Sequence, residues 1–496
     1  MQHFVNARAR RWPLTWRGRV NVVSRRSAKA KTWKLNVIIA ALFLVAAATL
    51  FLMGNARTLL SLAACLGLVV GVSHLLHWWN PTAVDIPKLS VLAYMVFSVI
   101  GLAVVINNRM NYGIDFGPSL DDSWYFAKSL SVAHGMLPAG SGPYDLATGS
   151  FAWCLSFAIG EPQVIDLLPL NWAFGALCVG LSSQLAFLVT GRRCSTALLF
   201  AAVVGNSVFS DSVTHLYRDV FMLMFFLIAI VGAVRGKYIT AILSAVACAM
   251  VRGGHGMLAF AGIVFVYLSK ARIARASPIL FWTGVMTVVA AGWLVAHRVG
   301  TARYLPDYVR AIRSEERLSI IERARAREDV MMGPEKRGVA GSLTSIAYQL
   351  GPVGYILRPI VAIFTPVTFH PVRQTVEVHT RGVRPYLADA LRLTVLLHWI
   401  TTLLWIVLGP PLVLGLVRAA RGTTTQKAIL VLFVVAVFAV SFVSFQPRHR
   451  CPFILLFPTF LALAAGRLST EERLFLRIAR TGFLGGILLI NLVRYL

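Results

Sequence analysis

Long apolar runs constrain this chain more than any other feature. Hydrophobic residues make up 57% of the 496 positions and gather in stretches of about 20 residues, which is the length a helix needs to cross a bilayer. The runs lack the alternation over about ten residues that a membrane β-barrel would show. The sequence therefore predicts an all-α polytopic membrane protein with about 12–13 transmembrane helices and amphipathic helices on its outer face.

The expected membrane segments follow one another along most of the chain. They fall near residues 35–53, 58–78, 88–106, 167–190, 195–210, 219–234, 238–251, 254–269, 277–296, 392–417, 427–445, 450–466 and 481–494. A further apolar stretch, 346–369, contains several prolines, so we expect it to dip into the membrane or lie along it.

These runs divide the chain into six expected parts. They are a basic cytoplasmic tail (1–34), transmembrane helices 1–3 (35–106), an acidic outer loop with an interfacial helix (107–166), transmembrane helices 4–9 (167–296), an outer amphipathic or re-entrant segment (297–391) and C-terminal transmembrane helices (392–496).

Charge sets the expected orientation. The tail 1–34 holds ten Lys and Arg residues and no acid, whereas 107–166 holds six acids and two cations. Because cytoplasmic loops collect Lys and Arg, we expect the N-terminus inside and 107–166 outside. The chain carries a net charge of +28. Most of its cations lie at the ends of apolar runs, so we expect an anionic bilayer as the partner and no nucleic acid.

Two adjacent carboxylates, Asp121 and Asp122, stand out in the outer loop. Just outside a membrane, such a pair suggests acid/base chemistry. The amphipathic pattern after it predicts a short interfacial helix with its aromatics, including Tyr125, toward lipid. The competing interpretation is that one of the two acids only caps that helix. Two Asp are too few ligands for a metal site, so no metal ligand is assigned and the cofactor stays unknown, with a divalent metal left open. The six cysteines show no paired spacing, and we expect neither disulfides nor a zinc site.

Under this orientation, the other unusual polar residues reach the same outer face. Charges at span edges are expensive unless they pair or serve a site. Arg suits phosphate because its planar fork donates two parallel hydrogen bonds. We therefore expect phosphate-binding roles for Arg218, Arg252, Arg448 and Arg450, and supporting roles for Tyr125, Asp219, His255 and His449.

The run Pro118-Ser-Leu-Asp-Asp-Ser-Trp-Tyr-Phe-Ala-Lys-Ser-Leu130, followed by His134-Gly135, resembles the first outer loop of the GT-C glycosyltransferases, in particular those like family 39. The segment Pro447-Arg-His-Arg-Cys-Pro452 is similar to the Arg-Tyr-x-x-Pro edge of these enzymes, with His449 at the Tyr position. Tyr217-Arg-Asp219 with the later Arg252 resembles a pattern in related bacterial membrane proteins. In this chain the acidic loop follows the third expected span, whereas many relatives have it after the first.

The resemblance implies a bacterial inner-membrane enzyme that takes sugar from a polyprenyl-phosphate carrier on the outer face, with Asp121 or Asp122 as the catalytic base. A second hypothesis is a flippase, or an Arg-driven polymerase, of lipid-linked saccharides that needs no acid/base catalysis. The acid pair discriminates the two, because only the enzyme requires one of these carboxylates. The sugar, the acceptor and the oligomeric state stay open.

Overall fold

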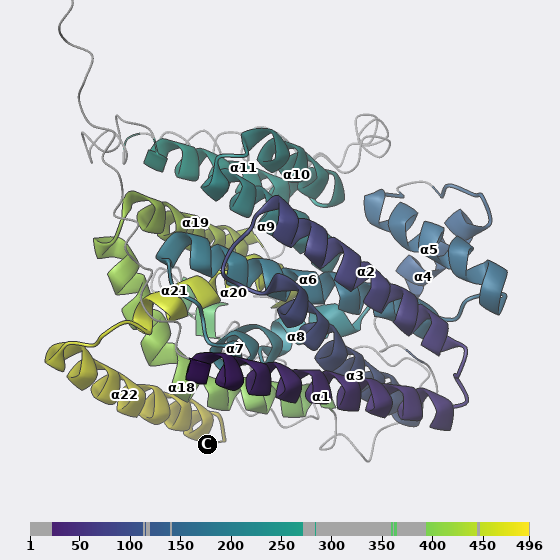
Figure 1. Ribbon diagram of the computed structural model, residues 1–496, viewed down its shortest axis with the longest axis horizontal. Coiled ribbons are helices and arrows are strands. Elements are labelled where there is room, and N and C mark those ends of the chain that lie inside the picture. Colours follow the sequence, from purple (N-terminus) through teal and green to yellow (C-terminus); the bar gives the residue numbers. More distant parts are fainter. Residues whose placement is uncertain are drawn as a thin grey trace, which may run out of the picture.

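A computed structural model of the chain describes residues 22–112, 115, 120–138, 141–270, 283, 359–360, 362–364, 393–443 and 447–495. The regular structure in these residues is helical (Figure 1). The helices are α1 (Val22–Leu52), α2 (Thr58–Trp79), α3 (Ile86–Tyr112), α4 (Leu120–Ala133), α5 (Pro143–Ile159), α6 (Val164–Thr190), α7 (Thr196–Leu199), α8 (Ser207–Thr214), α9 (Arg218–Arg235), α10 (Tyr238–Val251), α11 (Gly253–Lys270), α18 (Leu393–Arg421), α19 (Thr424–Val443), α20 (Cys451–Ile454), α21 (Phe457–Ala464) and α22 (Thr470–Tyr495).

Six of the described helices are long and apolar enough to cross a membrane. The spanning portions are Leu35–Leu52, Thr58–Trp79, Ile86–Met110, Val164–Thr190, Leu396–Arg421 and Thr424–Ser441. The chain is thus an all-α, multi-pass membrane protein. Each of these helices coincides with an apolar run of the sequence, because a backbone in hydrocarbon must satisfy its own hydrogen bonds within the segment.

The span expected near 195–210 is bent in the structure. The helical segments Thr196–Val204 and Ser207–Thr214 meet at a 70° bend, and together they form one broken span or a re-entrant loop. A π-helical turn, Phe200–Val204, precedes the bend. Asn206 then starts α8, because its side-chain oxygen accepts a hydrogen bond from the Val208 amide at 3.1 Å. An N-cap in the middle of an apolar run turns one expected span into two short helices.

Other expected spans are shorter, more polar or outside the described residues. α9 contains three charged residues, and α10 and the Cys451–Ala464 pair of helices are short. Most of 277–296, the segment 297–345 and most of 346–369 lie outside the described residues. The described residues therefore support six spans, or up to seven with the bent pair, instead of the expected 12–13.

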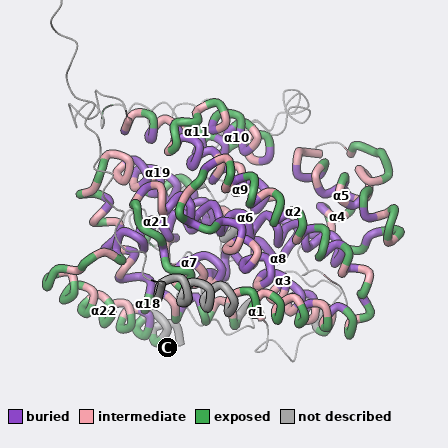
Figure 2. The backbone as a smooth tube through the Cα atoms, viewed as in Figure 1, coloured by how far each residue is buried: buried purple, intermediate pink, exposed green. Residues whose placement is uncertain are grey.

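α6 forms the centre of the bundle (Figure 2). Every residue of α6 from Val164 to Ala186 is buried, and the helix packs against α2, α3, α9 and α21. At its first turn, Asp166 accepts a hydrogen bond from Thr58 Oγ1 at 2.5 Å and from the Gln163 amide at 2.8 Å. This fully buried carboxylate joins the start of α2 to the start of α6, and the nearby Arg57 Nη2, at 3.4 Å, offsets part of its charge.

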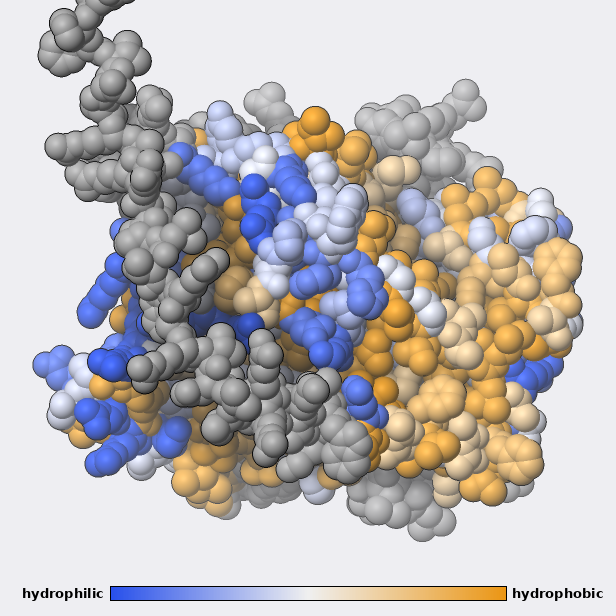
Figure 3. Space-filling view, viewed as in Figure 1, coloured by the Kyte–Doolittle hydropathy of each residue, from blue (hydrophilic) through white to orange (hydrophobic). Residues whose placement is uncertain are grey.

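The two chain ends that the structure describes are amphipathic or lipid-exposed. α1 begins at Val22, so it starts within the segment 1–34 that was expected to be a tail. α22, at the lower left of Figure 1, carries exposed apolar side chains such as Leu474 and Ile478 together with several Arg residues. Figure 3 shows hydrophilic and hydrophobic residues mixed in this region, and a broad hydrophobic surface on the right of the view. A mixed surface is typical of a helix at the membrane interface.

Close contact between α3 and α6 gives a stability prediction. A Cβ at Gly101 would overlap the buried indole of Trp172, whereas a Cβ at Gly67 in α2 would meet no atom within 4 Å. We expect Gly101→Ala to lower the free energy of unfolding by about 1–3 kcal/mol through overpacking. Gly67→Ala, the matched control, should be neutral or slightly stabilising. Thermal unfolding in detergent measures both, and equal midpoints would contradict the close α3–α6 packing.

Candidate functional site

Asp122 lies in the first turn of α4 and contacts the connection between α8 and α9. Its side chain is buried, 1% exposed. Oδ1 accepts a hydrogen bond from the Leu216 amide at 2.9 Å, and Oδ2 lies 2.6 Å from Nδ1 of His215. Asp122 thus joins two segments about 93 residues apart in the sequence. These bonds go well beyond a helix cap, so the carboxylate has a tertiary role.

His215 lies between two carboxylates. Its Nδ1 faces Asp122, and its Nε2 is 3.5 Å from Oδ1 of Asp211, one helical turn earlier in α8. Burial alone would lower the pKa of His215, but the charge of Asp122 and the hydrogen bonds with Asp122 and Asp211 outweigh it and raise this pKa well above its ordinary value. This shift favours the protonated, cationic form of the imidazole. Its ring stacks on that of Tyr217 at a centroid distance of 5.1 Å.

Asn171 holds the α8–α9 connection in place. This fully buried amide of α6 donates through Nδ2 to the carbonyl oxygens of His215 and Tyr217, the second at 3.1 Å. Its Oδ1 accepts a hydrogen bond from the Tyr144 hydroxyl at 3.0 Å. One side chain therefore fixes both the extended backbone around His215 and the position of α5.

The acidic segment 107–166 contains two helices, α4 and α5, where the sequence indicated one. They pack together at Gly149, where a Cβ would overlap the side chain of Val132. The expectation that the aromatics of α4 face lipid is wrong for Tyr125, which is 6% exposed, whereas the neighbouring Trp124 is 49% exposed. Tyr125 turns inward because its ring packs edge-to-face on Tyr144, with the centroids 5.4 Å apart.

Arg218, the first residue of α9, approaches this aromatic cluster. Its guanidinium carbon lies 6.0 Å from the centroid of the Tyr125 ring. Arg218 also acts on Asp145 of α5, where it opposes the rise in pKa that burial produces for this carboxyl, as do the Gly142 amide and Lys128. The structure thus brings a cation from the α8–α9 connection to the α4–α5 pair.

The next charge of α9, Asp219, is paired across the bundle. Its side chain is 2% exposed, and its Oδ1 lies 2.5 Å from Nη1 of Arg252, at the end of α10. The following helix begins with Gly253, and its His255 ring meets the ring of His449 edge-to-face at 5.9 Å. Removing one member of such a buried pair leaves an uncompensated charge, which typically costs about 3–5 kcal/mol.

The segment Pro447–Arg450 forms a 3-10 turn that leads into α20. Arg450 is buried, 4% exposed. The next residue, Cys451, lies against α8, with its Sγ 3.5 Å from Oγ of Ser212. α20 also contacts α9. The late basic segment therefore reaches the same end of α8 and α9 as the residues above.

The structure thus gathers most of the residues singled out in the sequence into one region. They come from α4, the α8–α9 connection, the α10–α11 junction and the turn before α20: Asp122, Tyr125, Arg218, Asp219, Arg252, His255, His449 and Arg450. The side chains of Asp121 and Arg448 lie outside what the structure describes. Among the described residues, no group of three or more His, Cys, Asp or Glu side chains could hold a metal ion.

Sequence reasoning missed His215, Asp211 and Asn171 as members of the site. A signal for Asn171 existed, because an amide inside the apolar run 167–190 is expensive in a membrane unless it is satisfied by protein. His215 and Asp211 lie in or beside the short polar stretch between two apolar runs, four residues apart and thus on one helix face.

The chain matches no family model, no curated protein and no solved structure.

The charge on His215 makes stability depend on pH. A histidine whose pKa is raised by folding stabilises the folded state fully below its unfolded pKa of about 6.5, and this contribution is lost as pH rises through the folded pKa. We expect the unfolding midpoint of the wild-type protein to fall as pH rises above about 6.5. In His215→Gln this part of the pH dependence should disappear. Thermal unfolding in detergent across neutral and alkaline pH tests it, and identical profiles for both proteins would contradict a charged His215.

Proposed function

We propose that this chain is a membrane glycosyltransferase that moves a sugar from a polyprenyl-phosphate carrier to an acceptor on the outer, periplasmic face of a bacterial inner membrane. Such a reaction serves cell-envelope glycan or glycolipid assembly. The observation that carries the proposal is the buried Asp122 held against His215, with arginines from separate segments nearby. The resemblance of the outer loop to that of GT-C glycosyltransferases supports the same reaction.

In this proposal the two acids around His215 have different roles. Both oxygens of Asp122 are engaged, by His215 and by the Leu216 amide, so Asp122 is a positioning residue that keeps the imidazole charged and fixed. Asp211, across the ring and 38% exposed, is the carboxylate that an acceptor hydroxyl can reach. Two carboxylates around one imidazolium leave a net negative charge, which stabilises the oxocarbenium-like sugar in the transition state. Asp121 stays a second candidate base in the same turn of α4.

The arginines bind the leaving polyprenyl phosphate in this proposal. Arg218 begins α9 beside the Tyr125 ring, Arg450 precedes α20, which contacts α8 and α9, and Asp219 pairs with the guanidinium of Arg252. Arg448 lies in the same turn as Arg450. Charge-assisted hydrogen bonds to the phosphate grow stronger as negative charge develops on it, which lowers the barrier to transfer.

The first test removes the charge of Asp122 and keeps its shape. We expect Asp122→Asn to lower the transfer of sugar from a polyprenyl-phosphate donor by about 10²–10⁴-fold, the range typical for disabled acid/base catalysis, because the imidazole beside Asp211 loses the carboxylate that keeps it charged and fixed. The protein should still insert. Glu161→Gln, an exposed carboxylate of the same loop, is the matched control and should keep full activity. The measurement is product formation by purified protein in nanodiscs.

Two results would contradict the enzyme assignment. One is near-normal turnover by Asp122→Asn. The other is a wild-type protein that moves a lipid-linked saccharide across vesicles without transferring its sugar, which would favour the flippase.

The second test concerns the phosphate. We expect Arg450→Ala to weaken binding of the polyprenyl-phosphate donor by about 10- to 150-fold, which corresponds to losing a charged hydrogen bond of about 1.5–3 kcal/mol. Arg450→Lys should have a smaller effect, because Lys keeps the charge and loses the planar fork. Arg193→Ala, an exposed Arg in the connection after α6, serves as the control. If a folded Arg450→Ala protein bound the polyprenyl-phosphate donor as tightly as the wild type, Arg450 would have a structural role and no part in phosphate binding.

A further inference from the structure

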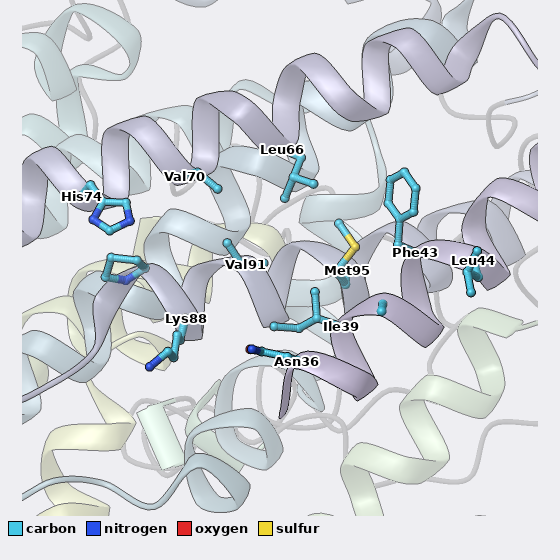
Figure 4. A pocket seen from close by; sticks show the side chains of 12 residues that line it. Asn36, Ile39, Phe43, Leu44, Leu66, Val70, His74, Lys88, Val91 and Met95 are labelled. Carbon is cyan, nitrogen blue, oxygen red and sulfur yellow. The ribbon is translucent and has the colours of Figure 1, made fainter. Parts of the chain in front are cut away.

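A groove of about 620 Å³ runs among α1, α2 and α3, and none of the site residues lines it. Its volume is in the range of about 300–1,000 Å³ that small-molecule sites occupy. Figure 4 shows His74 and Lys88 on the left, across the groove from each other, Asn36 near Ile39, and the apolar side chains of Phe43 and Leu44 toward the right. The groove therefore has one polar end and one apolar end, as an amphipathic ligand does.

The polar end lies at one boundary of the membrane. Asn36 follows the first residue of the α1 span, and Lys88 is in the first turn of α3. Trp78, at the end of α2, is 77% exposed. Aromatic residues of this kind gather at the level of the lipid headgroups. Asn36, His74 and Lys88 are thus at headgroup depth.

The apolar end reaches into the hydrocarbon. Phe43 and Met95 are each seven residues further along their helices than Asn36 and Lys88. Seven residues of helix span roughly 10 Å, which is most of the roughly 15 Å of hydrocarbon in one leaflet. The groove therefore has the depth and polarity that fit a lipid headgroup with the first part of an acyl chain.

The charge around the polar end is positive. Lys88 pairs with Asp85 at 2.7 Å, and both side chains are nearly half exposed, so this pair is weak. Arg235, the last residue of α9, donates a hydrogen bond to the Pro81 carbonyl, and Lys237, just after it, donates one to the carbonyl of Trp79, the last residue of α2. Three cations against one acid favour an anionic headgroup.

We propose that this groove is a binding site for one anionic glycerophospholipid, with its phosphate at Lys88, His74 and Asn36 and one acyl chain between α1, α2 and α3. The site is separate from the region around Asp122 and does not depend on glycosyl transfer. A bound lipid would join α1 to α2 and α3 and would couple the stability of this part of the bundle to the anionic lipid content of the membrane.

The experiment uses the full chain in nanodiscs of equal phosphatidylglycerol and phosphatidylcholine, with one of the two lipids carrying a photoactivatable acyl chain. Cross-linked peptides are mapped by mass spectrometry. We expect phosphatidylglycerol to cross-link to the groove segments 36–44, 66–74 and 88–95 about fivefold more than phosphatidylcholine, the ratio that corresponds to about 1 kcal/mol.

Variants separate the headgroup from the chain. Lys88→Ala should remove most of the preference for phosphatidylglycerol, whereas Lys427→Ala, a cation at the start of α19, should leave it unchanged. Val70→Trp, and independently Val91→Trp, should fill the groove and suppress cross-linking of both lipids.

Three outcomes would overturn the proposal. They are equal cross-linking by the two lipids, cross-links spread evenly over the lipid-exposed faces of α1, α10 and α19, and cross-linking that persists in both folded Trp variants. Displacement of phosphatidylglycerol by polyprenyl phosphate would overturn the choice of occupant. Sugar transfer is not measured, so failure here is distinguishable from failure of the proposed function.

Discussion

The buried amide of Asn171 is the constraint on which the polar region of this protein depends. An amide inside a membrane bundle must find partners within the protein, because no water is available to it. Asn171 finds them in the hydroxyl of Tyr144 and in the carbonyls of His215 and Tyr217. These bonds tie α5, α6 and the α8–α9 connection together. Because Asn171 binds the carbonyls of His215 and Tyr217, it holds the backbone around His215 in an extended conformation. In that conformation the His215 side chain contacts Asp122.

The charges of the region are held in opposed pairs. Asp122 meets His215, and Asp219 meets Arg252, with both carboxylates almost completely buried. Pairing lets a low-dielectric interior keep ionised groups that it would otherwise neutralise. It also makes the same residues serve stability and chemistry. A substitution in either pair must therefore be assessed for folding and for transfer separately.

The first three helices connect the lipid groove, at one end of the bundle, to the polar region around Asp122 at the other. α3 begins beside the lipid groove at Lys88 and leads to the end from which α4 and Asp122 follow. The central helix α6, buried from Val164 to Ala186, lies against α2 and α3. A buried central helix keeps the lipid groove and the polar region at a fixed separation, because well-packed interiors deform little.

The sequence by itself determined the helices and their class, since apolar runs of spanning length must satisfy their backbone bonds internally. It also indicated that Asp122, Arg218, Arg252 and Arg450 belong to one face, from the charge of the connections. Only the tertiary structure decided the bend at Asn206, the inward turn of Tyr125 and the contact of Asp122 with His215. The hydrophobic periodicity of the sequence predicts none of these three features. The bend depends on a cap that interrupts an apolar run, the position of Tyr125 depends on a ring of another helix, and the Asp122–His215 contact joins residues far apart in the chain. Hydrophobicity fixes which segments enter the membrane, whereas the pairing of buried polar groups fixes how those segments meet.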